Sequence, residues 1–168
     1  MFARRMAAYL LLAAAVGCGN APEMADSGKD GWLKGGAGEQ METVARHLRG
    51  NDIAMWEVGY RFGELYWAGA EENWPLAAYQ LTKIRLAMDL ANQRRPKRAA
   101  SYAAFFDEGL PEINEAVAAK DKAAFDTGFD VLTAACNSCH VAENLEFFVV
   151  RKPDYRPAPL GRSIDNGQ

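Results

Sequence analysis

Two cysteines and a histidine near the C-terminal end of the chain, Cys136, Cys139 and His140, stand in the order C-x-x-C-H. Thiols at this spacing can add across the two vinyl groups of a haem to form thioethers, and the adjacent histidine then lies under the iron. The pattern therefore predicts one covalent haem c per chain, with Cys136 and Cys139 as attachment residues and His140 as the proximal iron ligand.

Two other kinds of site also use a pair of cysteines at this spacing. A thioredoxin-like redox pair should open a helix after a strand, whereas this pair closes a helix late in an all-helical pattern. A structural zinc site needs four nitrogen or sulfur ligands, and the chain has only one further cysteine, Cys18, and one further histidine, His47. The spacing therefore favours haem over both alternatives.

The N-terminal residues have the features of a bacterial export signal. Arg4 and Arg5 precede the apolar run 6–16, which is too short to cross a bilayer as a helix. The run ends in Ala-Val-Gly-Cys, which resembles a lipobox, where cleavage before the cysteine accompanies attachment of a diacylglycerol. We therefore predict a lipoprotein-type signal peptide at 1–17, a lipid on Cys18, and a periplasmic, membrane-anchored location. An ordinary secretory signal that leaves a free Cys18 thiol is the alternative.

The rest of the chain divides by composition and periodicity. Residues 18–40 are rich in glycine and charge, which predicts a flexible tether. Residues 41–153 carry helical periodicity and are expected to form the haem-binding domain, beginning with a short lead-in helix over 41–48. The tail, 154–168, is rich in proline, glycine and arginine, and we expect it to be irregular.

Four stretches of this domain repeat apolar residues at intervals of three and four, the period of helices in a bundle. The first is predicted to run from Asp52 to Ala70 and the second from Asn73 to Pro96. The third is predicted to run from Ala99 to Ala119 and the fourth from Asp121 to the C-x-x-C-H motif. Asp52, Asn73 and Asp121 are candidate N-caps, and Pro111 should kink or split the third helix because it lacks an N–H donor. Short connections favour an all-α, up-down-up-down four-helix bundle with covalent haem near the C-terminal end of the fourth helix.

Each predicted helix has one apolar face that should point to the core. These faces comprise Met55, Val58, Phe62, Leu65 and Gly69; Ala77, Leu81, Ile84, Met88 and Ala91; Ala103, Phe106, Leu110, Ile113 and Val117; and Phe125, Phe129, Leu132 and Cys136. In an up-down bundle the start of the first helix and the ends of the second and fourth share one end, so Met55 and Met88 should both lie near His140.

A helical pattern with C-x-x-C-H near the end of the last helix resembles cytochrome c-prime and the related c-556 group. The segments ELYWAG at 64–69, NWPLAAY at 73–79 and LTAACNSCH at 132–140 are similar to a bacterial family of small exported cytochromes c. The resemblance covers residues 50–153 and implies haem binding and electron transfer with a redox partner protein. Related bundle cytochromes with a methionine ligand take it from the first helix, which points to Met55 as the distal iron ligand.

The distal side of the haem leaves two functions open. With Met55 on the iron, the protein would be an electron carrier. Cytochrome c-prime instead leaves this side open under an apolar residue, which would suit binding or buffering of NO or CO. Met88 and His47 are further candidate ligands, although Met88 could equally be a core residue and His47, next to two arginines, is better explained as a solvated surface residue. The basic loop 94–98 is either a partner for haem propionates or acidic proteins, or a solvated loop.

The composition excludes other classes of protein. With 168 residues, 49% of them hydrophobic, the chain can bury a sizeable core. A net charge of -3 argues against a nucleic-acid binder. We find no acid-base pair or nucleophile placed at the haem motif, so we predict no enzymatic activity of its own. Membrane contact is expected only through the lipid anchor, and homodimer formation is left open.

Overall fold

The computed structural model describes residues 25–156, which are mainly helical. One isolated antiparallel bridge joins Ser27 and Leu33, and no β-strand occurs within this range. The predicted all-α class is therefore confirmed. The chain divides into two compact units between Leu48 and Arg49, later than the domain start predicted at residue 41.

Several predictions fall on residues outside this range. The predicted signal peptide, Cys18 with its lipid, and most of the predicted tail belong to residues 1–24 and 157–168. Within residues 25–156, no helix is long and apolar enough to cross a membrane.

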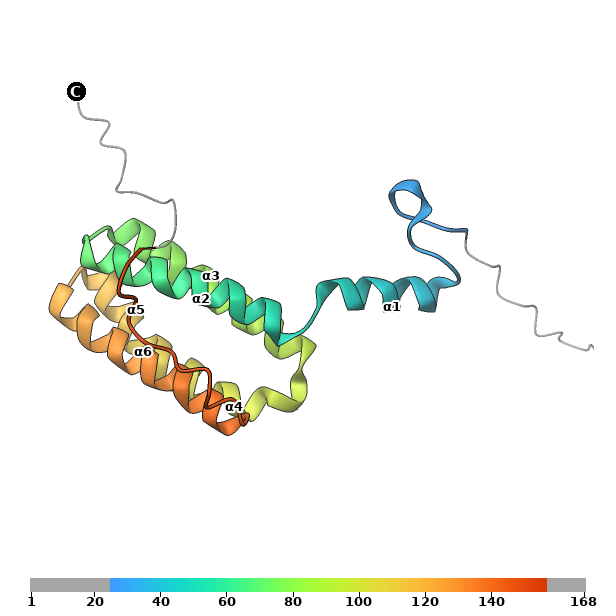
Figure 1. Ribbon diagram of the computed structural model, residues 1–168. Helices are drawn as coiled ribbons and strands as arrows, with labels where there is room; N and C mark the ends of the chain where they lie inside the picture. Colours follow the sequence, from blue (N-terminus) through green and yellow to red (C-terminus); the bar gives the residue numbers. More distant parts are fainter. Residues whose placement is uncertain (1–24, 157–168) are drawn as a thin grey trace, which may run out of the picture. The chain divides into compact units, whose positions relative to one another are not determined.

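The first unit contains the 3-10 turn Lys29–Gly31 and helix α1, Ala37–Leu48 (Figure 1). The buried Gln40 side chain connects this helix to the preceding turn. Its amide nitrogen donates to the carbonyl oxygens of Ala25 and Gly35 at 3.1 and 2.8 Å, and its oxygen accepts from the Ser27 hydroxyl. The last part of the predicted tether is therefore tied to α1, which begins earlier than the predicted residue 41.

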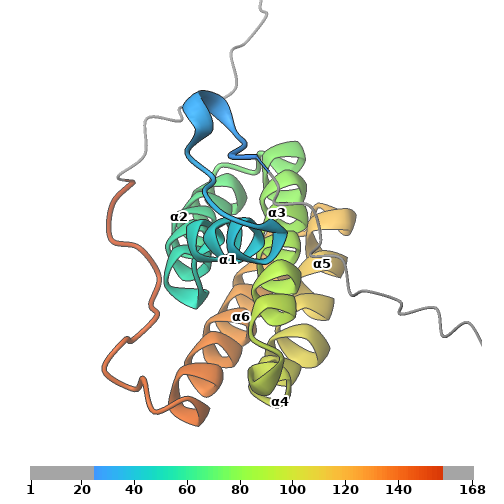
Figure 2. The ribbon, with the colours of Figure 1, turned by 90° about the vertical axis from the view of Figure 1, so that its right-hand side faces the viewer.

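The second unit is a bundle of helices joined by short connections (Figures 1 and 2). Its elements are α2 (Asn51–Ala70), α3 (Trp74–Arg94), the 3-10 turn Pro96–Arg98, α4 (Ala99–Ala104), α5 (Leu110–Ala119) and α6 (Lys122–Ala142). Helix α2 lies along α3, and α6 lies along α4 and α5. Contacts of α2 with α6 and of α3 with α5 join these two groups.

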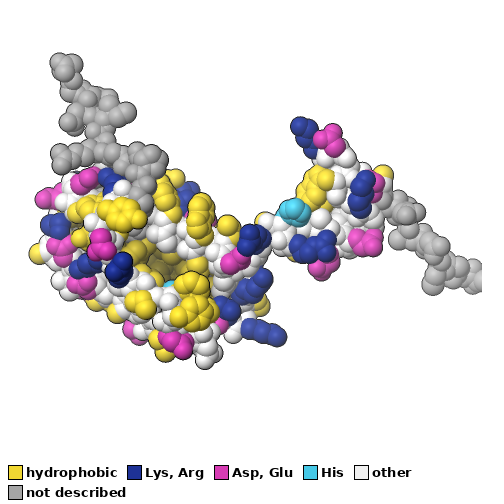
Figure 3. All heavy atoms as spheres, viewed as in Figure 1, with side chains coloured by type: hydrophobic (Ala, Val, Ile, Leu, Met, Phe, Trp, Pro, Cys, Tyr) yellow, Lys and Arg dark blue, Asp and Glu magenta, His cyan; other side chains and the backbone are white. Residues whose placement is uncertain are grey.

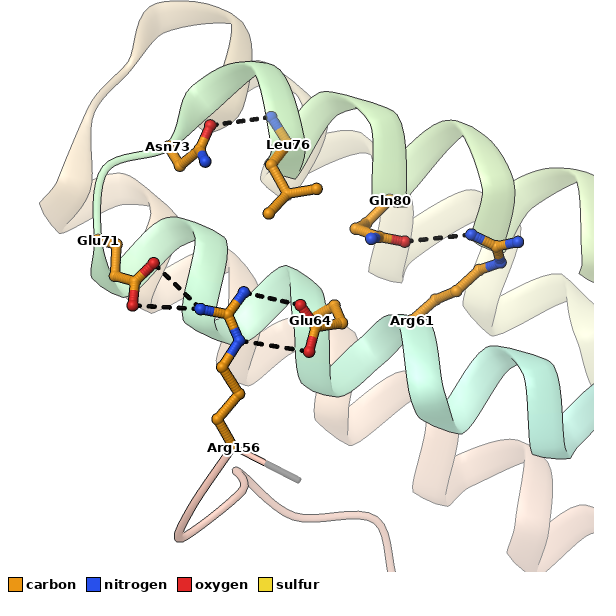
Figure 4. A network of polar contacts seen from close by, with 7 residues as sticks. All are labelled: Arg61, Glu64, Glu71, Asn73, Leu76, Gln80 and Arg156. Carbon is orange, nitrogen blue, oxygen red and sulfur yellow. Dashed lines mark hydrogen bonds and ion pairs between the residues drawn. The ribbon is translucent and has the colours of Figure 1, made fainter. Parts of the chain in front are cut away.

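Two of the three predicted N-caps are present. The Asn73 side chain accepts a hydrogen bond from the Leu76 N–H at 3.3 Å (Figure 4), and Asp121 accepts from the Ala124 N–H at 3.0 Å. These bonds satisfy backbone donors that the first turn of a helix leaves without partners. The prediction for Asp52 was wrong, because α2 begins at Asn51 and places Asp52 inside its first turn.

The third predicted helix is divided by a π-helical turn, Phe105–Gly109, between α4 and α5. The Leu110 N–H donates to the Phe105 carbonyl, one residue further back than in an α-helix. Pro111 follows directly; its ring would crowd the carbonyl of the preceding α-helical turn, and it has no N–H to donate. The wider turn accommodates the proline without ending the helical path.

The π-helical turn also moves the core face of this helix by one residue. Tyr102 and Phe105 are 2% and 1% exposed, whereas Ala103 is exposed and Phe106 is only partly buried. The prediction that Ala103 and Phe106 point to the core was wrong, because it assumed an unbroken α-helical period. Beyond the turn the period holds, and Leu110 is buried as predicted.

The other three predicted core faces are confirmed apart from Met55 and Cys136, which are partly buried. An aromatic cluster around the fully buried Phe129 joins α6 to α2. Its ring centroid lies 4.5 Å from that of Phe62, 5.2 Å from that of Tyr66 and 5.8 Å from that of Phe125. These contacts fix how α6 faces α2.

After α6, residues 143–156 contain no helix or strand and run back along the bundle (Figures 1 and 2). We call this segment the C-terminal strap. Its last residue, Arg156, forms ion pairs with Glu64 and Glu71 of α2 (Figure 4). The strap is therefore attached to the bundle at both ends.

Gly69 of α2 permits the close approach of α6, because a Cβ there would overlap the Phe125 ring. We expect Gly69→Ala to lower the free energy of unfolding by about 1–3 kcal/mol through overpacking. Gly63→Ala on the same helix is the matched control, since its Cβ would meet no atom within 4 Å, and it should raise stability by up to about 1 kcal/mol. Denaturant unfolding measures both, and equal effects would contradict the assigned role of Phe125.

Candidate functional site

A pocket in the second unit collects side chains from α2, α3, the π-helical turn, α6 and the strap. Its lining residues are Met55, Val58, Gly59, Phe62, Met88, Phe105, Cys136, Cys139, His140 and Val150. The empty volume is about 540 Å³, including the part that opens to solvent. Figure 3 shows a hollow with apolar walls on this face of the molecule. The pocket therefore contains all four residues predicted to hold the haem and its iron.

The last turns of α6 present three of these residues together. Cys136, Cys139 and His140 occupy positions i, i+3 and i+4, which lie on one face of an α-helix. The same face carries Leu132, which is fully buried one turn earlier. Packing of α6 in the core thus directs the motif into the pocket.

The His140 ring is oriented by a backbone carbonyl of the strap. Its Nδ1 lies 2.6 Å from the carbonyl oxygen of Phe148. A carbonyl can only accept, so Nδ1 carries the proton and donates it, which leaves Nε2 as the nitrogen with a free lone pair. This is the arrangement of a histidine that binds a metal through Nε2.

Both thiols lie in surroundings that keep them protonated at neutral pH. Burial raises the pKa of Cys136 to about 12, and the neighbouring Cys139 acts in the same direction. The pKa of Cys139 is also raised, first by burial and then by the carboxylate of Glu143, while Arg98 opposes the shift. Neither thiol is therefore a ready thiolate of the kind that redox-active cysteines use.

Two thioether side chains face this pocket from neighbouring helices. Met55 of α2 is partly buried, and Met88 of α3 is 4% exposed. Apart from the cysteines and His140, the other lining side chains are apolar. Among the described residues, the sulfur atoms of Met55 and Met88 are therefore the only further side-chain atoms on the pocket wall that could bind a metal. His47 belongs to α1 in the first unit, where its ring centroid lies 4.9 Å from that of Trp32.

Polar groups gather at the helix ends beyond Met55 and Met88. The Arg94 Nε is buried and has no partner at hydrogen-bonding geometry among the described residues, and the buried Tyr102 hydroxyl lies beside the Asn51 side chain. Burial also raises the pKa of Tyr102, so its hydroxyl remains a donor at neutral pH.

Within residues 25–156, no three His, Cys, Asp or Glu side chains cluster as ligands for a bare metal ion. The donor set of the pocket instead consists of two thiols, one imidazole and two thioethers on apolar walls. Such a set would suit an iron that is held within an organic macrocycle, because the two thiols could bond to the macrocycle and the imidazole could bind the iron. The residues present therefore fit a haem c.

Sequence reasoning missed part of the pocket wall. Phe105 enters it only because of the π-helical turn, and Gly59 lies one helical turn after Met55 on α2. Of residues 147–150 in the strap, only Val150 lines the pocket. Phe147, Phe148 and Val149 are 60–70% exposed.

Comparison of the chain with protein-family models, with curated proteins and with solved structures finds no match. The resemblance to bundle cytochromes c therefore stays a prediction from the motifs.

In chain produced without haem, we expect iodoacetamide to modify Cys139 faster than Cys136. Only the thiolate reacts, and Cys136 has its pKa raised to about 12 by burial. Peptide mass spectrometry over time at mildly alkaline pH measures both rates. In denaturant the two thiols should react equally, and equal rates in the folded chain would contradict the burial of Cys136.

Proposed function

We propose that the second unit is a mono-haem c-type cytochrome that transfers electrons to or from a partner protein, without enzymatic activity of its own. The observation that supports this most directly is the convergence of Cys136, Cys139, His140 and Met55 in one apolar pocket. In this proposal the helices form an up-down-up-down four-helix bundle with the haem near the C-terminal end of α6.

When bound, the haem would supply an iron that alternates between the ferric and ferrous states. Cys136 and Cys139 would hold the macrocycle through thioethers, and His140 would bind the iron through Nε2 while its Nδ1 donates to Phe148. The walls of Val58, Phe62 and Phe105 would exclude water.

We propose Met55 as the distal ligand, because it lies on the helix from which related bundle cytochromes take theirs. Met88 lines the same pocket and is the alternative thioether. If neither methionine binds the iron, the apolar wall around an open site suits the second candidate function, reversible binding of NO or CO.

The N-terminal pattern supports two further parts of the proposal. The chain would be exported to the periplasm of a bacterium, where haem c attachment takes place, and would be held at a membrane through a lipid on Cys18. The partner would be a redox protein that the sequence does not identify, and the negative net charge argues against a nucleic acid.

Covalent attachment gives the first test of the proposal. Protein made together with a bacterial haem-attachment system should keep haem-dependent peroxidase staining on a denaturing gel, because thioethers survive unfolding. Changing both Cys136 and Cys139 to Ala should abolish the stain, whereas Cys18→Ala, which leaves the C-x-x-C-H motif intact, should keep it. A wild-type chain that releases its haem on denaturation would refute the proposal.

The distal ligand gives a second test. Met55→Ala should lower the reduction potential and speed carbon monoxide binding, because a thioether stabilises ferrous iron and fills the sixth position. Met88→Ala, on the facing helix, is the matched control and should leave both properties near wild type. The reverse result would make Met88 the ligand. A wild-type protein that is already high-spin and binds carbon monoxide at once would favour the gas-binding function.

A further inference from the structure

We propose that the C-terminal strap, residues 143–156, positions His140, and that Asn137 and Arg156 are the residues that hold the strap in place. Through the bond between His140 and Phe148, the strap would set the orientation and basicity of the imidazole, and so the reduction potential of the iron. This inference rests on the proposed haem-binding function.

The strap begins with a turn that reverses the chain directly after His140. Asn144 adopts a left-handed conformation, with φ of 58°. The Leu145 N–H then donates to the His140 carbonyl at 2.8 Å, and the Asn144 N–H donates to the Val141 carbonyl at 3.1 Å. This pair of bonds is a Schellman motif, which closes a helix and redirects the backbone. It brings residue 148 back alongside the imidazole.

Asn137, the first variable residue of C-x-x-C-H, fastens the strap two residues beyond Phe148. Its amide nitrogen donates to the Val150 carbonyl at 2.9 Å, and its amide oxygen accepts from the Val150 N–H at 2.8 Å. Phe148 itself lies in a bend, where its N–H donates to the Leu145 carbonyl at 2.9 Å. This turn and the contact of Asn137 with Val150 lie on either side of the Phe148 carbonyl and together hold it beside His140.

Burial of side chains contributes little to holding this part of the strap, where Val150 alone packs against the core. Phe147, Phe148 and Val149 are 70%, 60% and 70% exposed, so they contribute little packing against the bundle. The Phe148 carbonyl thus depends on polar contacts on either side of it. Of these, the ion pair of Lys152 with Asp130 at 2.7 Å is largely exposed and contributes little.

The far end of the strap is held by Arg156. Its guanidinium donates to both carboxylate oxygens of Glu64, at 2.7 and 3.3 Å, and to both of Glu71, at 3.2 Å (Figure 4). Glu64 is 2% exposed, so its charge needs this partner. Arg156 therefore fixes where the strap ends on α2, and Asn137 fixes its middle on α6.

A hydrogen bond from Nδ1 to a carbonyl increases the electron density of the imidazole and makes Nε2 a stronger ligand for ferric iron. Loss of the Phe148 contact should accordingly raise the reduction potential. Neither Asn137 nor Arg156 lines the pocket in which the iron would lie, and Asn137 meets the pocket wall only through the backbone of Val150. Both therefore act through the strap and are positioning residues.

The central experiment compares Asn137→Ala with Ser138→Ala. Ser138 is the other variable residue of the motif and is exposed. Asn137→Ala should speed hydrogen exchange of the Val150 N–H by about tenfold, the effect of losing one such bond, and should raise the reduction potential. Ser138→Ala should change neither. Unchanged exchange and unchanged potential in Asn137→Ala would overturn the inference.

Arg156→Gln tests whether Arg156 holds the far end of the strap on α2. The double variant Glu64→Gln/Arg156→Gln also removes the buried negative charge of Glu64. Faster Val150 exchange in both variants supports a holding role for Arg156, whereas wild-type exchange in the double variant would limit that role to neutralising Glu64. Exchange is also measured on haem-free chain. One outcome separates the two proposals: the variants exchange the Val150 N–H faster, but the wild-type protein retains no haem. The holding role of Asn137 and Arg156 in the strap would then stand, whereas the proposed function and the tuning of the reduction potential would both be refuted.

Discussion

The rotational position of α6 is the constraint on which the rest of the site depends. Phe125, Phe129 and Leu132 are fully buried along one face of this helix, and Phe129 packs against aromatic rings of α2. Because a helix is rigid over such a distance, the same face continues into the C-x-x-C-H motif and brings it to the pocket. Gly69 permits this arrangement, since any side chain there would meet Phe125 and move α6 away from α2.

The walls opposite the motif come from elements that differ in the regularity of their helical hydrogen bonding. Helices α2 and α3 keep an unbroken period and contribute one methionine each, Met55 and Met88. Between α4 and α5, the π-helical turn next to Pro111 replaces one turn of α-helical hydrogen bonds. This turn presents Phe105 to the pocket. Departures of this kind often occur at functional sites, because they place a side chain where a regular helix would not.

The remaining wall is the strap, which is held differently from the helices. Its aromatic residues face solvent, and its position depends on an asparagine amide and on a buried carboxylate paired with an arginine. Burial of Glu64 would be costly without Arg156, so the ion pair specifies where the strap ends more than it adds stability. A chain segment held by directional bonds can keep one carbonyl oxygen at hydrogen-bonding distance from His140 without enclosing the pocket.

Much of this protein follows from short-range patterns in its sequence. The period of the apolar residues predicted the helices and most of their core faces, Asn73 and Asp121 marked two helix starts, and the spacing of Cys136, Cys139 and His140 indicated the site. These features depend on residues within one or two helical turns, so one sequence suffices to find them. The shifted face before Pro111, the pairing of Arg156 with Glu64 and the Phe148 carbonyl beside His140 were decided only by the tertiary structure. The first follows from how the chain accommodates the proline ring, the second joins residues far apart in the sequence, and the third involves a backbone atom that every residue has and no sequence pattern can mark.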